Sequence, residues 1–275
     1  MSVPLHWVRP DAPPVLALDE VHVWRFDLDE MIPDGLALER RLSAEERERA
    51  GRFRFTRDRE RYLAGRAGLR GILAGYAGAR PETLRFVRAP HGKPALLAAP
   101  EGLEFNLTHA DWCAVVAVAQ GRRVGVDVEG IRLGHSGMDV ARRFFAHAEV
   151  DTLLAAPPEE RAATFVRCWT RKEAYVKARG DGLSLSLQHF EVPLATGATR
   201  ALVSSLEDPA EVERWSLCEL VPAPCHLGAL VVEGERFDLR AWEWTPAERD
   251  ISAPLDSGPQ PRYPDRTTLM RSPRE

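Results

Sequence analysis

One stretch of alternating residues constrains this chain more than any other, the motif Val124-Gly-Val-Asp-Val-Glu129. Successive side chains of a β-strand point to opposite faces of the sheet, so the valines and the two carboxylates do not share a face. The pattern therefore predicts a strand that is buried on one side and presents Asp127 and Glu129 together on the other. Carboxylates held this close repel each other unless a cation relieves them.

A second stretch, Trp169-Thr-Arg-Lys-Glu-Ala-Tyr-Val-Lys177, repeats at helical spacing. Trp169, Glu173 and Lys177 recur every four residues and form one row along a helix, where Trp169 is expected to be a core anchor. Three carboxylates and a lysine, if the fold brings them together, suit a hard divalent cation and a phosphate. The alternatives are an ordinary exposed strand face and a surface ion pair worth about 0.3–0.5 kcal/mol.

Hydrophobic periodicity and turn residues predict the other elements. Ser43 and Glu46 form an expected capping box that opens a charged helical segment to about residue 75, and this helix is expected to be buried from Tyr62 onward. Strands are expected at 21–26, 84–87, 104–109, 114–119 and 124–129, with a hairpin turn at 120–123 joining the last two. Helices are expected over 138–155 and 159–179, and strands over 189–193, 215–221 and 227–233.

This order of elements favours the α+β class over the strict alternation of a doubly wound sheet. Each half of the chain shows a long helical region followed by antiparallel strands, which indicates two similar subdomains. The last 25 or so residues carry five prolines and few apolar positions, and a disordered tail is expected there.

Composition excludes several classes of protein. The net charge of −4, from 37 basic and 41 acidic residues, argues against nonspecific nucleic-acid binding by the chain as a whole. The four cysteines lack Cys-x-x-Cys spacing, which argues against a zinc site and favours buried thiols in a reducing cytoplasm. No apolar run reaches the roughly 18 residues that span a bilayer, so a cytoplasmic protein with no membrane partner is expected.

Nine arginines crowd residues 40–61, interleaved with acids. Mixed charges at this spacing usually form a solvated helix face. Alternatively, one or two of the guanidiniums could bind a phosphate, or the arginines together could bind nucleic acid. His109, at the end of a strand, suits either a structural role or, beside the Thr108 hydroxyl, a phosphate. The hydrolase, P-loop, dinucleotide and zincin motifs are absent from the sequence.

Five motifs in order, over roughly residues 43–193, resemble the Sfp-type 4′-phosphopantetheinyl transferases. They are His91-Gly-Lys-Pro94, Phe105-Asn-Leu-Thr-His109, Gly125-Val-Asp-Val-Glu129, Arg143-Phe-Phe, and Trp169-x-x-Lys-Glu-x-x-x-Lys177 running on to Gly180-x-Gly-Leu183.

The resemblance implies an enzyme that uses Mg²⁺, or Mn²⁺ in its place, to move the 4′-phosphopantetheine arm of coenzyme A onto a serine of an apo acyl or peptidyl carrier protein. It also implies a monomer of two α+β subdomains related by a pseudo-twofold axis, with coenzyme A between them. The expected subdomains are 1–122 on the adenine and 3′-phosphate side and 123–248 on the metal and pyrophosphate side, followed by a tail over 249–275. The arginine and alanine content leans toward loading peptide or polyketide synthases. A noncatalytic coenzyme A or nucleotide-binding domain of the same fold is the alternative.

The resemblance also assigns roles to residues. It gives Asp127, Glu129 and Glu173 to the metal and Lys177 to the coenzyme A phosphates. The base that activates the serine is Glu173 or a metal-bound water held by Glu129, and the sequence does not choose between them. The nucleotide is assigned to Arg49 and Arg61 near the 3′-phosphate, Gly92, Lys93 and Pro94 beside the adenine, and Thr108 and His109 near the phosphates.

Two positions depart from the family pattern. Glu46 stands where the type member has a phosphate-binding lysine, so binding of the 3′-phosphate is expected to be weaker or to pass to neighbouring arginines. Ala110 replaces a serine after the histidine, which removes one hydroxyl from the site.

Overall fold

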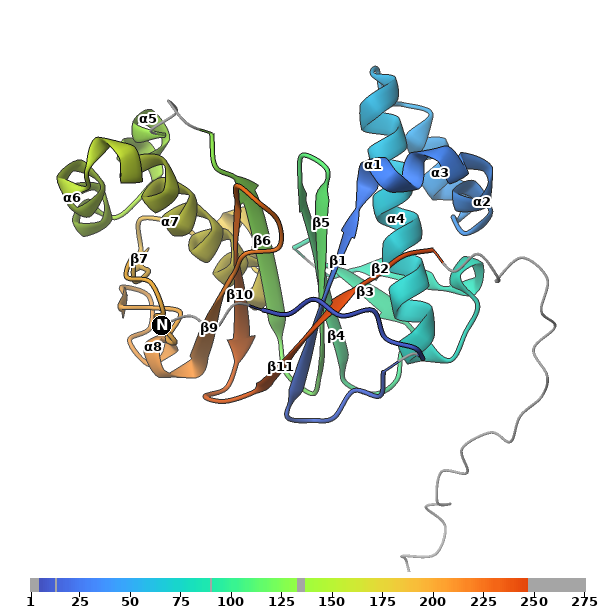
Figure 1. The fold of residues 1–275 in the computed structure, drawn as a ribbon. Helices are drawn as coiled ribbons and strands as arrows, with labels where there is room; N and C mark the ends of the chain where they lie inside the picture. The colour runs from blue at the N-terminus through green and yellow to red at the C-terminus, as the bar shows by residue number, and fades with distance from the viewer. Residues whose placement is uncertain (1–4, 13, 90, 133–136, 247–275) are drawn as a thin grey trace, which may run out of the picture. The chain divides into compact units, whose positions relative to one another are not determined.

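Two β-sheets and two long helices organise the computed structural model, which describes residues 5–12, 14–89, 91–132 and 137–246 (Figure 1). The predicted tail over 249–275 lies outside the described residues. Helices packed against largely antiparallel sheets make an α+β fold, as the sequence predicts. In the described part of the chain, no helix combines the length and the apolar character needed to cross a membrane.

The N-terminal half is built on a four-stranded sheet with the order β11-β1-β5-β4. Its strands are β1 (Glu20–Asp27), β4 (Leu103–Ala110), β5 (Cys113–Gln120) and β11 (Asp238–Glu243). Strands β1, β5 and β4 pair antiparallel, whereas β11 pairs parallel with β1. Strand β11 therefore returns to the N-terminal sheet from the far end of the described chain.

Helices cover one side of this sheet, and the longest of them, α4 (Thr56–Ala77), ends at a left-handed Gly78. The predicted capping box is confirmed, because Glu46 N–H donates to Ser43 Oγ and Ser43 N–H donates to Glu46 Oε2. The charged segment is divided by residues 51–55 into α3 and α4. The smaller elements of this half are α1 (Leu28–Met31), η1 (Ile32–Asp34), α2 (Gly35–Arg40), α3 (Ala44–Ala50), η2 (Pro81–Thr83), β2 (Arg85–Arg88) and β3 (Pro94–Leu97).

The C-terminal half is built on a three-stranded antiparallel sheet, β6-β10-β9, against which helix α7 (Pro158–Arg179) packs. Its strands are β6 (Val124–Gly130), β9 (Trp215–Leu220) and β10 (His226–Glu233). Helices α4 and α7 are both 22 residues long, which fits the expectation of two similar halves. The smaller elements are α5 (Met138–Phe144), α6 (His147–Ala155), η3 (Gly182–Ser184), β7 (Phe190–Glu191), β8 (Ser204–Ser205) and α8 (Glu211–Arg214).

The helical pattern over 138–155 forms two helices instead of one. Phe145 is extended, with φ −92° and ψ 158°, and separates α5 from α6. Glu149 then accepts the N–H of Ala146 at 2.9 Å and so caps the new helix. The apolar periodicity continues across the break, which is why the sequence pattern alone does not reveal it.

The predicted hairpin between β5 and β6 is wrong. Both edges of β5 are already occupied, by β1 and by β4, and β6 pairs with β10 in the other sheet. Strand β6 instead packs against β4, where the Val126 N–H donates to Asn106 Oδ1 at 2.9 Å. Residues 120–123 therefore cross from one sheet to the other.

The valine face of β6 is buried, as its alternation predicts. Val124, Val126 and Val128 are at most 1% exposed and belong to a core cluster that also contains Val21 and Val115 of the other sheet. This shared core joins the two halves and holds β6 with its acidic face beside β4.

Candidate active site

The centre of the candidate site is the buried carboxylate of Asp127, in the middle of β6. Its Oδ1 accepts hydrogen bonds from Lys177 Nζ at 2.5 Å and from Thr108 Oγ1 at 3.0 Å. Lys177 lies in the last turn of α7 and Thr108 lies on β4, so three elements meet at one oxygen. Asp127, Lys177 and Thr108, far apart in the sequence, thus form one contact network.

The other oxygen of Asp127 is a candidate ligand for a cation. Oδ2 is buried and has no hydrogen-bond partner among the described residues. Burial raises the pKa of Asp127, although the Lys177 ammonium and the Thr108 hydroxyl oppose this rise. A buried carboxylate oxygen without a partner costs free energy, and a bound cation would remove that cost.

Glu129 and Glu173 lie within the electrostatic reach of Asp127. Burial raises the pKa of both glutamates, and in both cases the negative charge of Asp127 raises it further. The Lys177 ammonium lowers both pKa values in part. Asp127 therefore repels both glutamates, and the charge of Lys177 acts on all three carboxylates. The excess of negative charge is one that a divalent cation would neutralise.

The residues present fit a magnesium ion by their chemistry, since hard oxygen donors are what that ion prefers. Within the described ranges, however, no three acidic, histidine or cysteine side chains converge closely enough to hold a metal. The unpartnered Asp127 Oδ2 is the donor that is ready to bind. Assignment of the metal to Asp127, Glu129 and Glu173 stays a prediction.

A glycine allows the close approach of β6 and α7. A Cβ built on Gly125 of β6 would collide with the Ala174 carbonyl oxygen and the Ala178 amide nitrogen of α7. Only a residue without a side chain allows this approach of strand and helix. The contact places Asp127, two residues further along β6, opposite the last turns of α7.

The His91-Gly-Lys-Pro94 segment lies where the two halves meet. Gly92 has φ +89°, and Pro94 begins β3. Lys93 Nζ donates to the Val124 carbonyl at 3.0 Å and to Glu104 Oε2 at 3.4 Å. Burial lowers the pKa of Lys93, and Glu104 partly restores it. The loop expected to border the adenine thus contacts the first residue of β6.

His109 and Arg61 extend the positive side of the site. The His109 side chain is exposed, yet the protein packed around it lowers its pKa, and the charges of Lys177 and Arg61 lower it further. Arg61 Nε and Nη2 donate to the two carboxylate oxygens of Asp29 at 2.7 and 2.6 Å. Arg61 is therefore fixed by a bidentate pair, and its charge reaches His109.

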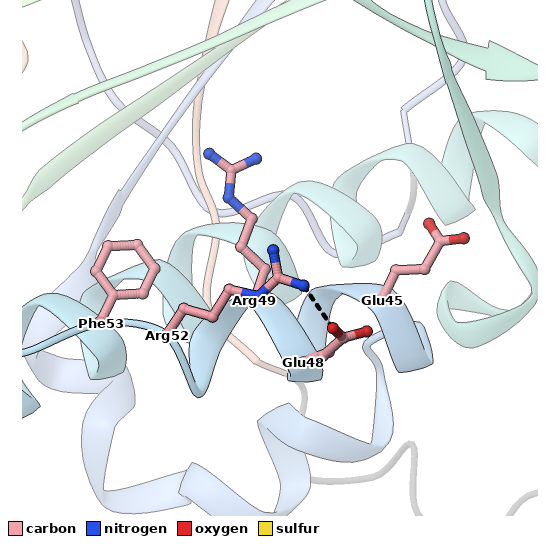
Figure 2. Close-up of a pocket in the computed structure, with 5 residues that line it drawn as sticks. All are labelled: Glu45, Glu48, Arg49, Arg52 and Phe53. Carbon is pink, nitrogen blue, oxygen red and sulfur yellow. Dashed lines mark hydrogen bonds and ion pairs between the residues drawn. The ribbon is translucent and has the colours of Figure 1, made fainter.

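Arg49 lies apart from this network, in an open hollow of about 550 Å³ on α3 and the residues after it (Figure 2). The hollow is also lined by Glu45, Glu48, Arg52 and Phe53. Arg49 contacts the face of the Tyr62 ring, whereas Arg52 pairs with Glu48.

Glu46, which replaces the lysine of the family's type member, is held by hydrogen bonds within the protein. Its carboxylate is buried and accepts hydrogen bonds from Arg66 Nε at 2.6 Å and Arg70 Nε at 2.7 Å, besides the Ser43 N–H. Burial raises the pKa of Glu46, but the charges of Arg66 and Arg70 outweigh it and hold the pKa below its usual value. Glu46 thus fastens α3 to α4.

Sequence reasoning missed Asp111, in the turn between β4 and β5. Asp111 has φ +51°, and its negative charge raises the pKa of Glu129. Arg132 lies 3.5 Å from Asp111 Oδ1, and the Nε2 of the buried His226 lies 3.8 Å from Oδ2. An aspartate between two strands is usually just a turn residue, so its position gave no signal of proximity to the site.

Two family models match this chain side by side. The model for the N-terminal part of 4′-phosphopantetheinyl transferases matches residues 34–121. The model for the 4′-phosphopantetheinyl transferase superfamily matches residues 123–227.

Two relatives named as 4′-phosphopantetheinyl transferases each match more than half of the chain. The 4′-phosphopantetheinyl transferase HetI of Nostoc sp. strain PCC 7120 is 39% identical over 236 residues, which are 84% of this chain and 96% of HetI. The 4′-phosphopantetheinyl transferase Sfp of Bacillus subtilis strain 168 is 31% identical over 154 residues, which are 56% of this chain and 66% of Sfp.

Among solved structures, the holo-[acyl-carrier-protein] synthase of Thermotoga maritima aligns with this chain over 42% of this chain and 64% of the synthase, with 20% sequence identity. The TM-score of this alignment is 0.30, which is too low to support an argument. The HetI match and the two models, one for each half, are the decisive findings. The chain therefore belongs to the 4′-phosphopantetheinyl transferase family, in the Sfp-type group with an N-terminal and a C-terminal subdomain.

Proposed function

We propose that this enzyme performs its transfer of phosphopantetheine from coenzyme A to carrier proteins at the Asp127 site. The observation that carries the proposal is the buried, unpartnered Asp127 Oδ2 beside Lys177, with two further carboxylates in electrostatic reach. A cation and a phosphate together satisfy this arrangement of charges better than either does alone.

Asp127, Glu129 and Glu173 would hold Mg²⁺, or Mn²⁺ in its place. When bound, the ion supplies positive charge beside the pyrophosphate of coenzyme A and lowers the cost of charge that develops on its oxygens. Its removal by a chelator is expected to abolish transfer. Because Asp127 repels Glu129 and Glu173 without it, ion binding is also expected to stabilise the fold.

Lys177 has two tasks in this proposal. In the absence of substrate it neutralises Asp127, to which Thr108 also donates. With coenzyme A bound, the Lys177 side chain, which is 28% exposed, would turn its ammonium toward the phosphates and stabilise charge on the leaving adenosine 3′,5′-bisphosphate. Thr108 and His109 would lie beside the same phosphates.

In the reaction, the carrier serine oxygen forms a bond to the β-phosphorus while the bond from that phosphorus to the leaving adenosine 3′,5′-bisphosphate breaks. The serine proton passes to a base. Glu173 is a candidate for this role because its carboxylate lies near Asp127 and Lys177; in the metal-free protein, burial and the charge of Asp127 raise its pKa, and a bound cation would act in the opposite direction. Glu129 shares these properties and could act through a water, so both remain candidates.

The nucleotide is assigned to the loop and helix residues on the N-terminal side. Gly92, Lys93 and Pro94 would border the adenine, and Arg49 and Arg61 would face the 3′-phosphate. Arg49 has no ion-pair partner among the described residues, which leaves its guanidinium available in the open hollow of Figure 2. The subdomain boundary near residue 122, the monomeric state and the cytoplasmic location remain predictions.

The test is to incubate the protein with coenzyme A, Mg²⁺ and an apo acyl or peptidyl carrier protein, and to weigh the carrier. Wild-type protein is expected to add the phosphopantetheine mass, and Asp127→Ala is expected to lose at least a thousandfold in rate while its circular dichroism is unchanged. Near wild-type loading by Asp127→Ala would refute the assignment of the site.

The same experiment separates the alternatives. A noncatalytic coenzyme A-binding domain would bind the nucleotide without changing the carrier mass. A nucleic-acid-binding role for the arginine-rich segment has little support, because Arg52, Arg57 and Arg59 pair with acids of the same chain.

A further inference from the structure

The residue before Glu173 on α7 is a fully buried lysine. Lys172 is 0% exposed, and its Nζ lies 2.8 Å from Glu149 Oε2 on α6. The same Nζ donates to the carbonyls of Leu187 and Phe190, at 2.7 Å each. Three partners use all three N–H groups of the ammonium, so its direction is fixed.

Glu149 is bound equally completely. Its Oε1 accepts the Val192 N–H at 2.8 Å, and its Oε2 accepts the Ala146 N–H at 2.9 Å besides the Lys172 ammonium. Burial raises the pKa of Glu149, and the Lys172 charge opposes this rise. The pair therefore ties α7 to the start of α6 and to residues 187–192.

Stability alone does not account for this pair. The free energy needed to desolvate two buried charges often exceeds their attraction, and apolar replacements of such pairs are frequently as stable. An ion pair with fixed hydrogen bonds does add one thing: it fixes the direction in which the Lys172 side chain leaves the helix. Successive residues of a helix point about 100° apart, so fixing Lys172 toward α6 also fixes where Glu173 points.

The side of α7 that faces the sheet is held by other contacts. Arg167 and the buried Arg171 donate to Glu219 Oε2 of β9 at 2.8 Å each, and Lys177 donates to Asp127 of β6. There the helix lies against β6 at Gly125, through the backbone of Ala174 and Ala178. At Gly125 itself the small residues allow the close approach, and the Lys172–Glu149 pair adds a further restraint on the rotation of α7 about its axis, from the side of α6. Glu173 and Lys177 both depend on that rotation to face Asp127.

We propose that Lys172 and Glu149 form a positioning pair, which sets the rotation of α7 and so aims Glu173 and Lys177 at Asp127. The inference rests on the proposed role of Glu173 in holding the metal. Neither member of the pair touches the substrate, so their effect on the reaction is indirect. Changes to groups that orient metal ligands typically weaken metal affinity about 10–100-fold.

The test compares Lys172→Met with the double variant Lys172→Met/Glu149→Gln. The single variant leaves Glu149 charged and buried, and its melting temperature is expected to fall. The double variant removes both charges and is expected to recover most of that loss. Mn²⁺ binding in the presence of coenzyme A, measured by electron paramagnetic resonance at a temperature where all variants are folded, is expected to stay about tenfold weaker in both.

A purely structural role predicts the opposite result, namely that Mn²⁺ affinity recovers together with stability in the double variant. That outcome would overturn the inference. Arg70→Met is the matched control. Arg70 lies on the other long helix, α4, is as deeply buried as Lys172, and pairs with Glu46 of α3. This variant is expected to lose stability and to bind Mn²⁺ normally, and a tenfold loss there would also count against a specific role for Lys172.

Asp127→Asn separates this inference from the proposed function. If Asp127→Asn weakens Mn²⁺ binding and the double variant does not, the metal site stands and the positioning role fails. If Asp127→Asn binds Mn²⁺ as the wild type does, the proposed metal site itself fails.

Discussion

Asp127 shows at the residue scale how this site trades stability for function. Its Oδ2 is buried without a partner, and its charge raises the pKa of two neighbouring glutamates. Without a cation, each of these ionised carboxylates costs free energy in the folded state. Such unfavourable groups are characteristic of sites built to bind a ligand that supplies what is missing.

Glu129→Gln is expected to stabilise the metal-free protein at neutral pH. Folding raises the pKa of Glu129 above its ordinary value of 4.5. Ionisation of this glutamate therefore costs more in the folded than in the unfolded state, and at neutral pH it destabilises the fold. Below pH 4.5 the glutamate is protonated in both states, and the gain should disappear. Melting temperatures at pH 4 and pH 8, with a chelator present, measure this; a variant that is less stable than wild type at pH 8 would contradict the repulsion.

Glu46→Lys is expected to destabilise the protein, although it restores the residue type of the family's type member. The new ammonium would lie buried between Arg66 and Arg70, and breaking a buried pair costs about 3–5 kcal/mol. Urea denaturation measures the loss. The exposed neighbour Glu45 provides the control, since Glu45→Lys should change the free energy of unfolding by no more than about 0.5 kcal/mol.

At the scale of elements, the crossing of β6 and α7 decides where the site residues meet. The strand carries Asp127 and Glu129, the helix carries Glu173 and Lys177, and Gly125 allows their backbones to touch. The two elements therefore form one unit of the proposed site.

Gly125→Ala is expected to push α7 away from β6. The added Cβ meets backbone atoms, which cannot rotate aside, so a loss of about 3 kcal/mol in unfolding free energy is expected. A displacement of about 1 Å at the site should lower the transfer rate roughly a hundredfold. Gly35→Ala is the control, because a Cβ there meets nothing within 4 Å; equal effects of the two changes would show that the crossing is not special.

At the scale of the molecule, several connections unite the halves, besides the contacts between β4 and β6. Strand β11 completes the N-terminal sheet, the valine face of β6 shares a core with β1 and β5, and Lys93 bonds to the Val124 carbonyl. Residues 1–245 accordingly group as one compact unit.

One cooperative unfolding transition is expected from this arrangement, because each half loses its part of the shared core when the other unfolds. Urea curves followed by tryptophan fluorescence, which reports on tryptophans of both halves, Trp24 and Trp215 among them, should coincide with far-ultraviolet circular dichroism. Two separate midpoints would indicate halves that unfold independently.

The sequence by itself determined the family, the α+β class and most elements. Five motifs led to the family that the relatives confirm, and the alternation in β6 and the row on α7 predicted a strand and a helix that are both present. These signals are local, because they depend on side-chain periods of two and about 3.6 residues. Glu46 could be flagged as a departure, but not explained.

The tertiary structure alone decided which elements are neighbours. It placed β6 beside β10 instead of β5, returned β11 to the N-terminal sheet, brought Asp111 near Glu129 and buried Lys172 against Glu149. Each of these contacts joins residues distant in sequence or depends on which strand edges are already occupied. A local pattern can state what a residue needs, but only the packed chain determines which partner meets that need.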